Sequence, residues 1–515
     1  MKPLFTALLF IHFALASGVT ANNPDAMPDK QGQQEAIASV APDIDAFFLK
    51  HQEEAHVPGM VWGVVRDGEL VYTGGSGVQS IETEVPVGPD SLFRIASMSK
   101  AFTALAILKL RDDGLLALDD PVEKHIPELA GWKYPTSDSP RIRIRDLLSH
   151  AAGLVYDDAW GDRQQPLPEE EFTGLLEAGM PFSSAPQTQF EYSNTGYALL
   201  GRVITNVSGR PYDRYIMEEI MRPLGMINTR YEVRDAPEAN YVHGYRWEND
   251  AYAPEPILGH GAYGAMAGIQ TSIRDYARWV AFLLDAWPAR DGAETAPVRR
   301  SSVREMAQGL NFPEYYSVDR EGPEGPKKSG IAFTYGMGLC VIDDEDLGFV
   351  LSHGGGYPGY GSYVVLLPDR GLGLFAFANR TYATPSRPVI DSAIILQKSG
   401  LVPAREIPVS AALAGAYQAA LEVYASGDLS PAKDLLAMNF LLDRSAENWA
   451  RELARLKEEV GERIADTPIK ADGMLSGEFK WTCERGTIKG SITLAPTNPP
   501  GIQQLGFKAK PTAKE

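Results

Sequence analysis

The sequence predicts a mixed α/β fold of the α+β type: one antiparallel sheet flanked by helices, an all-helical subdomain, and a small C-terminal α+β module. Three observations support this prediction. Strand-like segments flank the turn Asp67-Gly68, further apolar strands follow from Gly336 onwards, and the sequence between them is helical with long loops rich in Pro and Gly. A chain of 515 residues is also long enough for more than one domain.

The N-terminal residues 1–21 have the pattern of a secretory signal peptide. Lys2 is followed by the short apolar run Leu4–Leu15 and then by the small-residue segment Val19–Ala21. The run is too short to span a membrane, no Cys follows that could carry a lipid, and no later stretch is long enough to span a bilayer. We therefore expect a secreted or periplasmic protein, in which the polar residues 22–40 form a linker.

Residues 41–400 are expected to form the main domain. A helix is predicted over 44–52, hairpin strands over 61–65 and 69–73, and a long loop over 315–330. The hairpin and the later strands are expected to share one antiparallel sheet. Those later strands are predicted at Gly336–Ile342, Phe349–Ser352, Tyr363–Leu367 and Leu372–Ala378.

A Pro-containing linker is predicted over 401–409, and the pattern then changes to that of a separate module over 410–515. Helices are predicted at Ser410–Ala425, Pro431–Leu442 and Glu447–Ile464, and strands at Gly477–Cys483, Thr487–Leu494 and Ile502–Lys508. This order weakly resembles that of cone-shaped domains of the NTF2 or cystatin-like type. The module contains no catalytic constellation, and its simplest role is that of a lid or a docking module for a partner or for the main domain.

Composition excludes several function classes. The net charge of −19 argues against binding to nucleic acids or to anionic membrane surfaces. Only Cys340 and Cys483 are present, so the chain is no disulfide scaffold; two buried thiols are expected, with a bridge as the alternative that an oxidising compartment would permit. The sequence from His51 to His56 lacks the His-Glu-x-x-His spacing, and no P-loop, Rossmann motif or Gly-x-Ser-x-Gly elbow is found. We expect no metal and no cofactor.

A candidate nucleophile is Ser97, where Ser-x-x-Lys precedes an apolar helix predicted over 101–110. Ser97 and Lys100 are three residues apart and would share one helix face. An ammonium beside a hydroxyl can hold or relay its proton, as a serine acyl-enzyme requires, and the helix N-terminus favours the developing alkoxide. The alternative is a serine that only caps the helix. That simpler interpretation is preferred for a second Ser-x-x-Lys at 430–433, where Pro431 follows the serine.

Tyr192 and Asn194 lie in a polar loop that enters a helix, where they could present a phenol and an amide to a cleft. A tyrosine close to Lys100 is expected to ionise more readily, because the neighbouring cation favours the phenolate. Tyr192 could then act as a base toward Ser97 and later as an acid toward the leaving group. Taken alone, the pair also suits a turn asparagine and a half-buried tyrosine.

His353 and three glycines, Gly354 to Gly356, follow the apolar run 349–351. Glycines let another backbone approach closely. The strand edge could therefore pair with an extended substrate, and a backbone N–H could face an oxyanion. Taken alone, the segment suits a glycine-rich turn with a structural histidine.

The order and spacing of these motifs resemble those of the serine beta-lactamase and penicillin-binding-protein superfamily. The most similar branch contains class C beta-lactamases, D-alanyl-D-alanine carboxypeptidases and related esterases. Two further segments, Ile144–Leu154 and Ala265–Asp275, resemble the "LLTHTSGL" and "GGLxSTxxDLA" segments of that family. The resemblance covers residues 41–400 and implies a beta-lactamase/transpeptidase-like fold for them.

The resemblance also implies a role for individual residues. Ser97 would be the nucleophile, and Lys100 and Tyr192 would form a coupled pair that moves its proton. Asn194 would orient Lys100 and bind the substrate. His150, in the first of the two further segments, is expected to have a structural role.

The remaining site residues follow the same resemblance. His353 and Gly355 would bind the substrate where the family carries Lys-Thr-Gly or His-Thr-Gly, and the backbone N–H groups of Ser97 and Gly356 would form the oxyanion hole. Two departures matter: His353 replaces a lysine, and Gly354 lacks a hydroxyl. A neutral imidazole binds a substrate carboxylate more weakly than lysine does.

Together these residues predict a secreted serine hydrolase that works through a Ser97 acyl-enzyme. Its substrate would be a small molecule or peptide, either a peptide amide, as for a D-amino-acid carboxypeptidase, or a small ester. Two alternatives stay open: a class C-type beta-lactamase, and a catalytically silent penicillin-binding-type scaffold whose C-terminal module binds a partner. The four residues Ser97, Lys100, Tyr192 and Asn194 favour the enzyme, because a silent scaffold has no need of all four.

Overall fold

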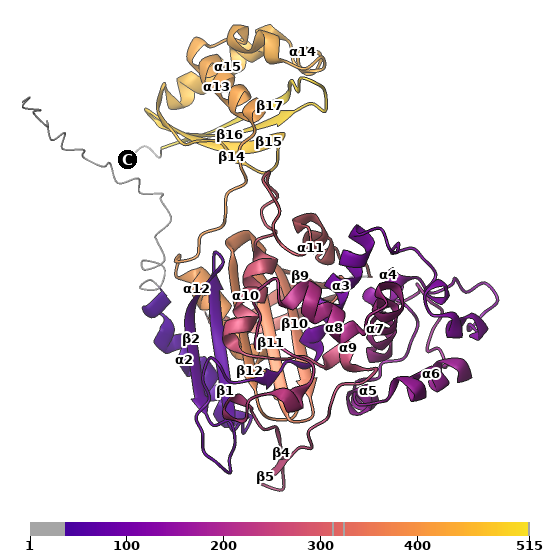
Figure 1. The fold of residues 1–515 in the computed structure, drawn as a ribbon. Coiled ribbons are helices and arrows are strands. Elements are labelled where there is room, and N and C mark those ends of the chain that lie inside the picture. Colours follow the sequence, from indigo (N-terminus) through magenta and orange to yellow (C-terminus); the bar gives the residue numbers. More distant parts are fainter. Residues whose placement is uncertain (1–36, 312–313, 323–324, 513–515) are drawn as a thin grey trace, which may run out of the picture.

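The computed structural model describes residues 37–311, 314–322 and 325–512, and consists of a body of sheet and helices followed by a C-terminal module (Figure 1). The expected signal peptide and residues 22–36 of the expected linker lie outside the described residues. Among the helices of the described segments, none is both long and apolar enough to cross a bilayer.

One antiparallel sheet of eight strands forms the centre of the body, in the order β2-β1-β12-β11-β10-β9-β8-β7. The early hairpin pairs with the last strand of the body, which confirms that the two ends of this region build one sheet. The strands are β1 (Gly59–Arg66), β2 (Glu69–Gly77), β7 (Glu314–Gly322), β8 (Gly325–Tyr335), β9 (Cys340–Asp344), β10 (Gly348–Tyr357), β11 (Tyr360–Leu367) and β12 (Leu372–Ala378).

Helices cover both faces of the sheet, which explains why β1 and β12 are buried along their whole length. On one face α2 (Ala41–Glu54) and α12 (Ser386–Lys398) pack together, and Trp62 of β1 stacks on the ring of Phe48. On the other face α10 (Ile273–Leu284) packs on β1 and β12. Alternate side chains of one strand therefore enter two different cores.

A helical subdomain packs against the second face of the sheet (Figure 1). Its central helix, α3 (Lys100–Asp112), is buried at nearly every position, so it is in contact with protein on all sides. The other helices of this part are α4 (Ile144–Leu148), α5 (Asp158–Gly161), α6 (Glu169–Ala178), α7 (Asn194–Ser208), α8 (Tyr212–Ile216), α9 (Gly264–Ala267) and α11 (Arg300–Met306). Two short strand pairs, β3 (Phe93–Arg94) with β6 (Gln270–Thr271) and β4 (Tyr245–Glu248) with β5 (Ala251–Pro254), complete it.

The prediction of a long loop over 315–330 is wrong, because this segment forms most of the β7–β8 hairpin. Its Pro and Gly residues suggested a loop, but its charged residues form ion pairs with other parts of the sheet. Arg320 donates to both carboxylate oxygens of Asp344 at 2.6 Å and to Asp346 at 2.9 Å. Ion pairs that reach from β7 past β8 to the end of β9 and the turn after it thus take the place of the apolar pattern that usually predicts a strand.

The strand expected to begin at Gly336 begins instead at Cys340, after a turn. Gly338 has φ of 75°, in the left-handed region that favours glycine. A side chain at Gly338 would meet the main chain of Lys100 and Ala101, so the turn packs directly on the first turn of α3. This tertiary contact is absent from the local sequence signal.

The C-terminal module has its own sheet and its own core. Five strands pair in the order β13-β15-β16-β17, with β14 beside β15, and helices α13 and α15 contribute to the core around Trp481. These elements are α13 (Ala411–Ser426), α14 (Phe440–Asp443), α15 (Ala446–Val460), β13 (Arg463–Asp466), β14 (Lys470–Ala471), β15 (Ser476–Cys483), β16 (Gly486–Leu494) and β17 (Ile502–Pro511). The α+β order expected for this module is confirmed.

Two of its predicted helices are wrong in extent. The helix expected over 431–442 is a 3₁₀ turn at Ser430–Leu435 and the short α14, because the backbone between them hydrogen-bonds to β17: the N–H of Ala437 donates to the carbonyl of Ile502 at 2.9 Å. The helix expected to end at 464 stops before Gly461, whose φ is 83°.

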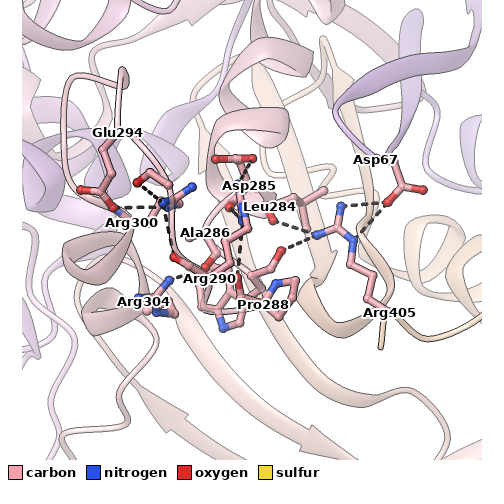
Figure 2. A network of polar contacts seen from close by, with 12 residues as sticks. Asp67, Leu284, Asp285, Ala286, Pro288, Arg290, Glu294, Arg300, Arg304 and Arg405 are labelled. Atoms are coloured by element: carbon pink, nitrogen blue, oxygen red, sulfur yellow. Dashed lines mark hydrogen bonds and ion pairs between the residues drawn. The ribbon is translucent and has the colours of Figure 1, made fainter. Parts of the chain in front are cut away.

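The segment joining the body to the module is fastened to the body by Arg405 (Figure 2). Its guanidinium donates to Asp67 Oδ1 at 2.8 Å and to the carbonyls of Leu284 and Trp287 at 3.0 and 2.7 Å. Figure 2 shows further arginines that hold the adjoining loop, including Arg304, which donates to the carbonyl of Ala286. A residue within the predicted linker 401–409 is therefore an anchor point.

Candidate active site

Ser97 lies in a short 3₁₀ turn, η1 (Ala96–Ser99), directly before α3. Ala96 has φ of 49°, a left-handed conformation that is uncommon for a residue with a side chain, and it turns the chain sharply out of β3. The Ser97 residue is 7% exposed, and its Oγ lies 3.0 Å from the Nζ of Lys100. The structure thus brings the two residues of the first motif into hydrogen-bond contact.

Lys100 is completely buried and its Nζ has two further partners. It donates to Oδ1 of Asn194 at 2.7 Å and to the carbonyl of Met266 at 3.2 Å. Burial lowers the pKa of Lys100 from 10.5 to about 8, although nearby carboxylates oppose this shift. The lysine is therefore neutral in an appreciable fraction of molecules at mildly alkaline pH, and in that form it can accept a proton.

Tyr192 reaches the same point from the loop before α7. Ser193 caps this helix, and the N–H of Ser193 donates to Nδ1 of His150 at 3.0 Å. Burial lowers the pKa of His150 well below its usual range, which keeps Nδ1 free to accept. The Tyr192 ring lies beside this imidazole, tilted by 34° at a centroid distance of 4.2 Å, and its centre lies 4.8 Å from the Nζ of Lys100.

The expected ionisation of Tyr192 is wrong in direction. Burial raises the pKa of Tyr192 well above its usual value, the carboxylate of Asp158 adds to this rise, and a hydrogen bond with Ser97 opposes it. The phenol is therefore protonated at neutral pH. Of the two residues assigned to proton transfer, Lys100 is the one whose lowered pKa gives access to a neutral form that accepts a proton, and Tyr192 is the one that keeps a proton to donate.

His353 is buried in β10, and both ring nitrogens are engaged. Nδ1 lies 2.6 Å from the carbonyl of Gly354, which can only accept, so Nδ1 carries the proton. Nε2 then accepts from the hydroxyl of Tyr335 at 2.9 Å. Burial lowers the pKa of His353 to about 3, so the ring is neutral. As placed, the imidazole presents neither a charge nor a free N–H to a substrate carboxylate.

One edge of β10 is open beside η1. β9 pairs with β10 only as far as Ser352, whereas β11 pairs with it as far as Tyr357. Residues 353–357 therefore have one main-chain edge without a strand partner among the described strands. Such an edge can accept an extended substrate.

Gly355 sets how closely β10 approaches η1. A methyl group on its α carbon would overlap the carbonyl oxygen of Ile95 and the hydroxyl of Ser362, which are joined by a hydrogen bond of 2.7 Å. Only glycine permits this approach. The contact brings together the two elements that carry Ser97 and Gly356, whose N–H groups are the predicted oxyanion donors.

An acidic segment that was not predicted from the sequence, residues 156–162, lies against Asn194. The carboxylate of Asp157 accepts the N–H groups of Asn194 and Thr195 at 2.6 and 2.9 Å, and so caps α7. Asp158 Oδ1 accepts from Nδ2 of Asn194 at 2.9 Å. The available signal was three aspartates among aromatic residues within seven positions, which resembled an ordinary polar loop.

Asp162, the last carboxylate of this segment, is buried and accepts from the hydroxyl of Tyr382 at 2.9 Å. Burial raises the pKa of Asp162 above its usual value. Desolvation and the negative charges of Asp157 and Asp158 disfavour an ionised carboxyl at this position, and the hydrogen bond from Tyr382 and the charge of Lys100 offset them only in part.

The second Ser-x-x-Lys lies in the C-terminal module, as its context suggested. Ser430 is exposed, begins a 3₁₀ turn, and donates through its main-chain N–H to Asp428 at 2.7 Å. Cys340 and Cys483 are both free thiols. Ser430 belongs to the separate C-terminal module, whereas the Cys340 thiol is close enough to Tyr192 to act on its pKa, but burial raises the pKa of this thiol to about 12 and keeps it protonated.

Comparison with protein-family models gives a match to the family described as Beta-lactamase over residues 44–398. The chain belongs to the beta-lactamase family. The match covers the body of sheet and helices and contains every residue of the candidate site, whereas the C-terminal module lies outside it.

The chain is also similar in sequence to curated proteins. The chain is 28% identical over 344 residues to Protein flp of Staphylococcus aureus strain MW2, an alignment that covers 65% of this chain and 62% of that protein. The chain thus matches less than two thirds of the length of this relative.

Two solved structures share the fold. One is the octameric penicillin-binding protein homologue from Pyrococcus abyssi, with a TM-score of 0.57 and 22% identity, covering 92% of this chain and 96% of that one. The other is the D-alanine carboxypeptidase AmpC from Burkholderia cenocepacia, with a TM-score of 0.54 and 21% identity, covering 70% of this chain and 99% of that one. These similarities confirm the beta-lactamase/transpeptidase-like fold predicted from the sequence.

The contact at Gly355 makes a matched pair of substitutions informative. We expect Gly355→Ala to lower Tm by about 3–10 °C, because the added methyl must displace either η1 or β11. Gly354→Ala is the control, since its methyl would meet Tyr363 only at ordinary contact distance. Thermal unfolding of both variants checks this, and equal Tm values would contradict the close approach.

Proposed function

We propose that this protein is a serine hydrolase that cleaves small esters or peptide amides through an acyl-enzyme on Ser97. The observation that carries this proposal is the buried hydrogen-bonded chain from Ser97 to Lys100 to Asn194, with the Tyr192 phenol at its reactive end. Burying a lysine costs free energy, because the ammonium loses its hydration. A function in catalysis accounts for keeping it there. Membership of the beta-lactamase family supports the same chemistry.

The first step is the attack of Ser97 on a carbonyl carbon. Neutral Lys100 accepts the hydroxyl proton while Oγ forms the new bond, and the negative charge moves to the carbonyl oxygen. The main-chain N–H groups of Ser97 and Gly356 stabilise that oxygen as the oxyanion hole. Asn194 keeps the Nζ of Lys100 directed at the serine through its Oδ1.

The second step expels the leaving group and the third restores the serine. Protonated Tyr192 donates to the departing oxygen or nitrogen, and regains a proton from Lys100. A water molecule then attacks the acyl carbon in the reverse sense, with the same pair removing its proton. The two residues thus act as one unit in both half-reactions.

The substrate class follows from what His353 offers. A carboxypeptidase or beta-lactamase substrate carries a carboxylate, whereas the neutral imidazole here is engaged with Tyr335 and Gly354. Uncharged esters and amides need no such anchor. We therefore place small esters and amides before cephalosporins, and we place the protein outside the cytoplasm on the basis of residues 1–21.

The nucleophile is tested by substitution. We expect Ser97→Ala to lower kcat/KM for p-nitrophenyl acetate by about 10³-fold or more, because no acyl-enzyme can form. Ser430→Ala, which changes the exposed serine of the second Ser-x-x-Lys, is the matched control and should keep full activity. Equal activity in wild type and Ser97→Ala would exclude this site.

The state of Lys100 is tested by pH. Because its neutral form is the base and its pKa lies at about 8, kcat/KM should rise with pH and level off above about 8. Tyr192 stays protonated over this range, since its pKa is raised. The measurement is ester hydrolysis between about pH 5.5 and 9.5, corrected for the rate of Ser97→Ala. A profile that falls through this range would contradict Lys100 as the base.

The order of substrates is tested directly. We expect p-nitrophenyl butyrate to have a higher kcat/KM than a chromogenic cephalosporin, although the cephalosporin can acylate Ser97 slowly, since nucleophile and oxyanion hole need no carboxylate anchor. Parallel initial-rate measurements on one preparation check this. Faster hydrolysis of the cephalosporin would make the beta-lactamase alternative the better description.

A further inference from the structure

Asp158 is linked to the candidate nucleophile by an unbroken series of hydrogen bonds. Its Oδ1 accepts from Asn194 Nδ2 at 2.9 Å, Asn194 Oδ1 accepts from Lys100 at 2.7 Å, and Lys100 lies 3.0 Å from Ser97 Oγ. The helix that carries Asp158 packs closely against Asn194. Gly161 permits this approach, since a side chain at that position would collide with Asn194. The carboxylate is thus a fixed part of the site wall.

Asn194 directs one polar group to each of two protein partners. Its oxygen faces Lys100 and its Nδ2 faces Asp158. What the wall presents next to Asn194 is therefore a carboxylate, which attracts donors and positive charge, rather than an amide alone.

Asp158 is more accessible to solvent than its two acidic neighbours, which are buried. Asp157 is used as the cap of α7, and Asp162 is buried beneath Tyr382. Asp158 is half-buried, and its second oxygen accepts from the hydroxyl of Tyr156 at 2.8 Å. Throughout the described part of the chain, no side-chain nitrogen of Arg, Lys or His forms an ion pair with it.

The charges around the site are unbalanced. Three carboxylates lie close enough to Lys100 to act on its charge, and burial makes that lysine easier to deprotonate. His353, on β10, adds no positive charge. A cation that entered with the substrate would relieve this imbalance, whereas an anion would increase it.

We propose that Asp158 is a specificity-determining residue that receives a positively charged amino group of the substrate. The preferred substrates would be esters or amides with a cationic nitrogen, and substrates with a carboxylate in that position would be disfavoured. This inference rests on the proposed function at Ser97, and it adds the substrate class.

Two pairs of esters test the inference, each pair differing only in N⁺ against C. One places the cation in the acyl part, as p-nitrophenyl 4-(trimethylammonio)butanoate against p-nitrophenyl 5,5-dimethylhexanoate. The other places it in the alcohol, as acetylcholine against 3,3-dimethylbutyl acetate. We expect wild type to prefer the cation in at least one pair by about tenfold in kcat/KM at low salt, and the preference to shrink at high salt.

Asp158→Asn should reduce that preference to less than about threefold, because the charge is removed while the shape is kept. Asp434→Asn, which removes an exposed carboxylate in the C-terminal module, is the matched control and should keep the preference. The ratio within each pair is the readout. A purely structural role of Asp158 would lower both esters together and leave the ratio unchanged.

The outcomes separate the inference from the proposed function. Absence of a cation preference in wild type, or a preference that survives Asp158→Asn, overturns the role of Asp158 while leaving Ser97 as nucleophile. If Asp158→Asn fails to fold, a preference in wild type that does not shrink with salt overturns the inference instead. Hydrolysis of all four esters by Ser97→Ala at the wild-type rate would overturn the proposed function itself.

Discussion

The burial of one ammonium group, that of Lys100, determines how this body is assembled. A lysine withdrawn completely from water is stable only if its hydrogen atoms find acceptors. Here the acceptors come from three different elements: Ser97 in η1, Asn194 at the start of α7, and Met266 in α9. Burial lowers the pKa of this lysine, and the same buried ammonium holds together the elements that line the site. The position of Lys100 is therefore required both for the chemistry and for the packing of the body.

The sheet and its β8–β9 turn contribute to the site through the close approach of their main chain rather than through side chains. At Gly355 and Gly338 the main chain approaches η1 and α3 so closely that a single added carbon would overlap them. The open main-chain edge of β10 is therefore held beside the nucleophile, and the geometry for a backbone-bound substrate does not depend on flexible side chains. Rigid placement of this kind suits groups that act on a developing charge.

Part of the architecture could be predicted from local sequence, because apolar periodicity and turn residues indicate the outer hairpin, the strands after residue 348 and helices such as α2, α3, α13 and α15. The β7–β8 hairpin could not, since its strands are stabilised by ion pairs such as Arg320 with Asp344 rather than by an apolar face. The interruption of the helix predicted over 431–442 could not be predicted either, because hydrogen bonds to β17 override helix propensity there.

The candidate site shows the same division. The motifs around Ser97, Tyr192 and His353 were recognisable because each needs particular residue types at fixed spacing, and the structure brings all three together. The engagement of His353 by Tyr335 and the contact of Asp158 with Asn194 were not predictable, because each joins residues from separate elements. The protonated state of Tyr192 depends on burial, which a local motif does not contain.

Arg405 gives the chain a fixed point of departure. Because its guanidinium is held by Asp67, by the carbonyl of Leu284 at the end of α10 and by that of Trp287 in the following loop, everything beyond residue 405 leaves the body from one defined place. The body therefore has a fixed attachment point for additional sequence. We expect that a different module could be joined there without altering the sheet, the helices or the residues around Ser97. Ending the chain after this residue would remove the module and keep the hydrogen bonds of Arg405.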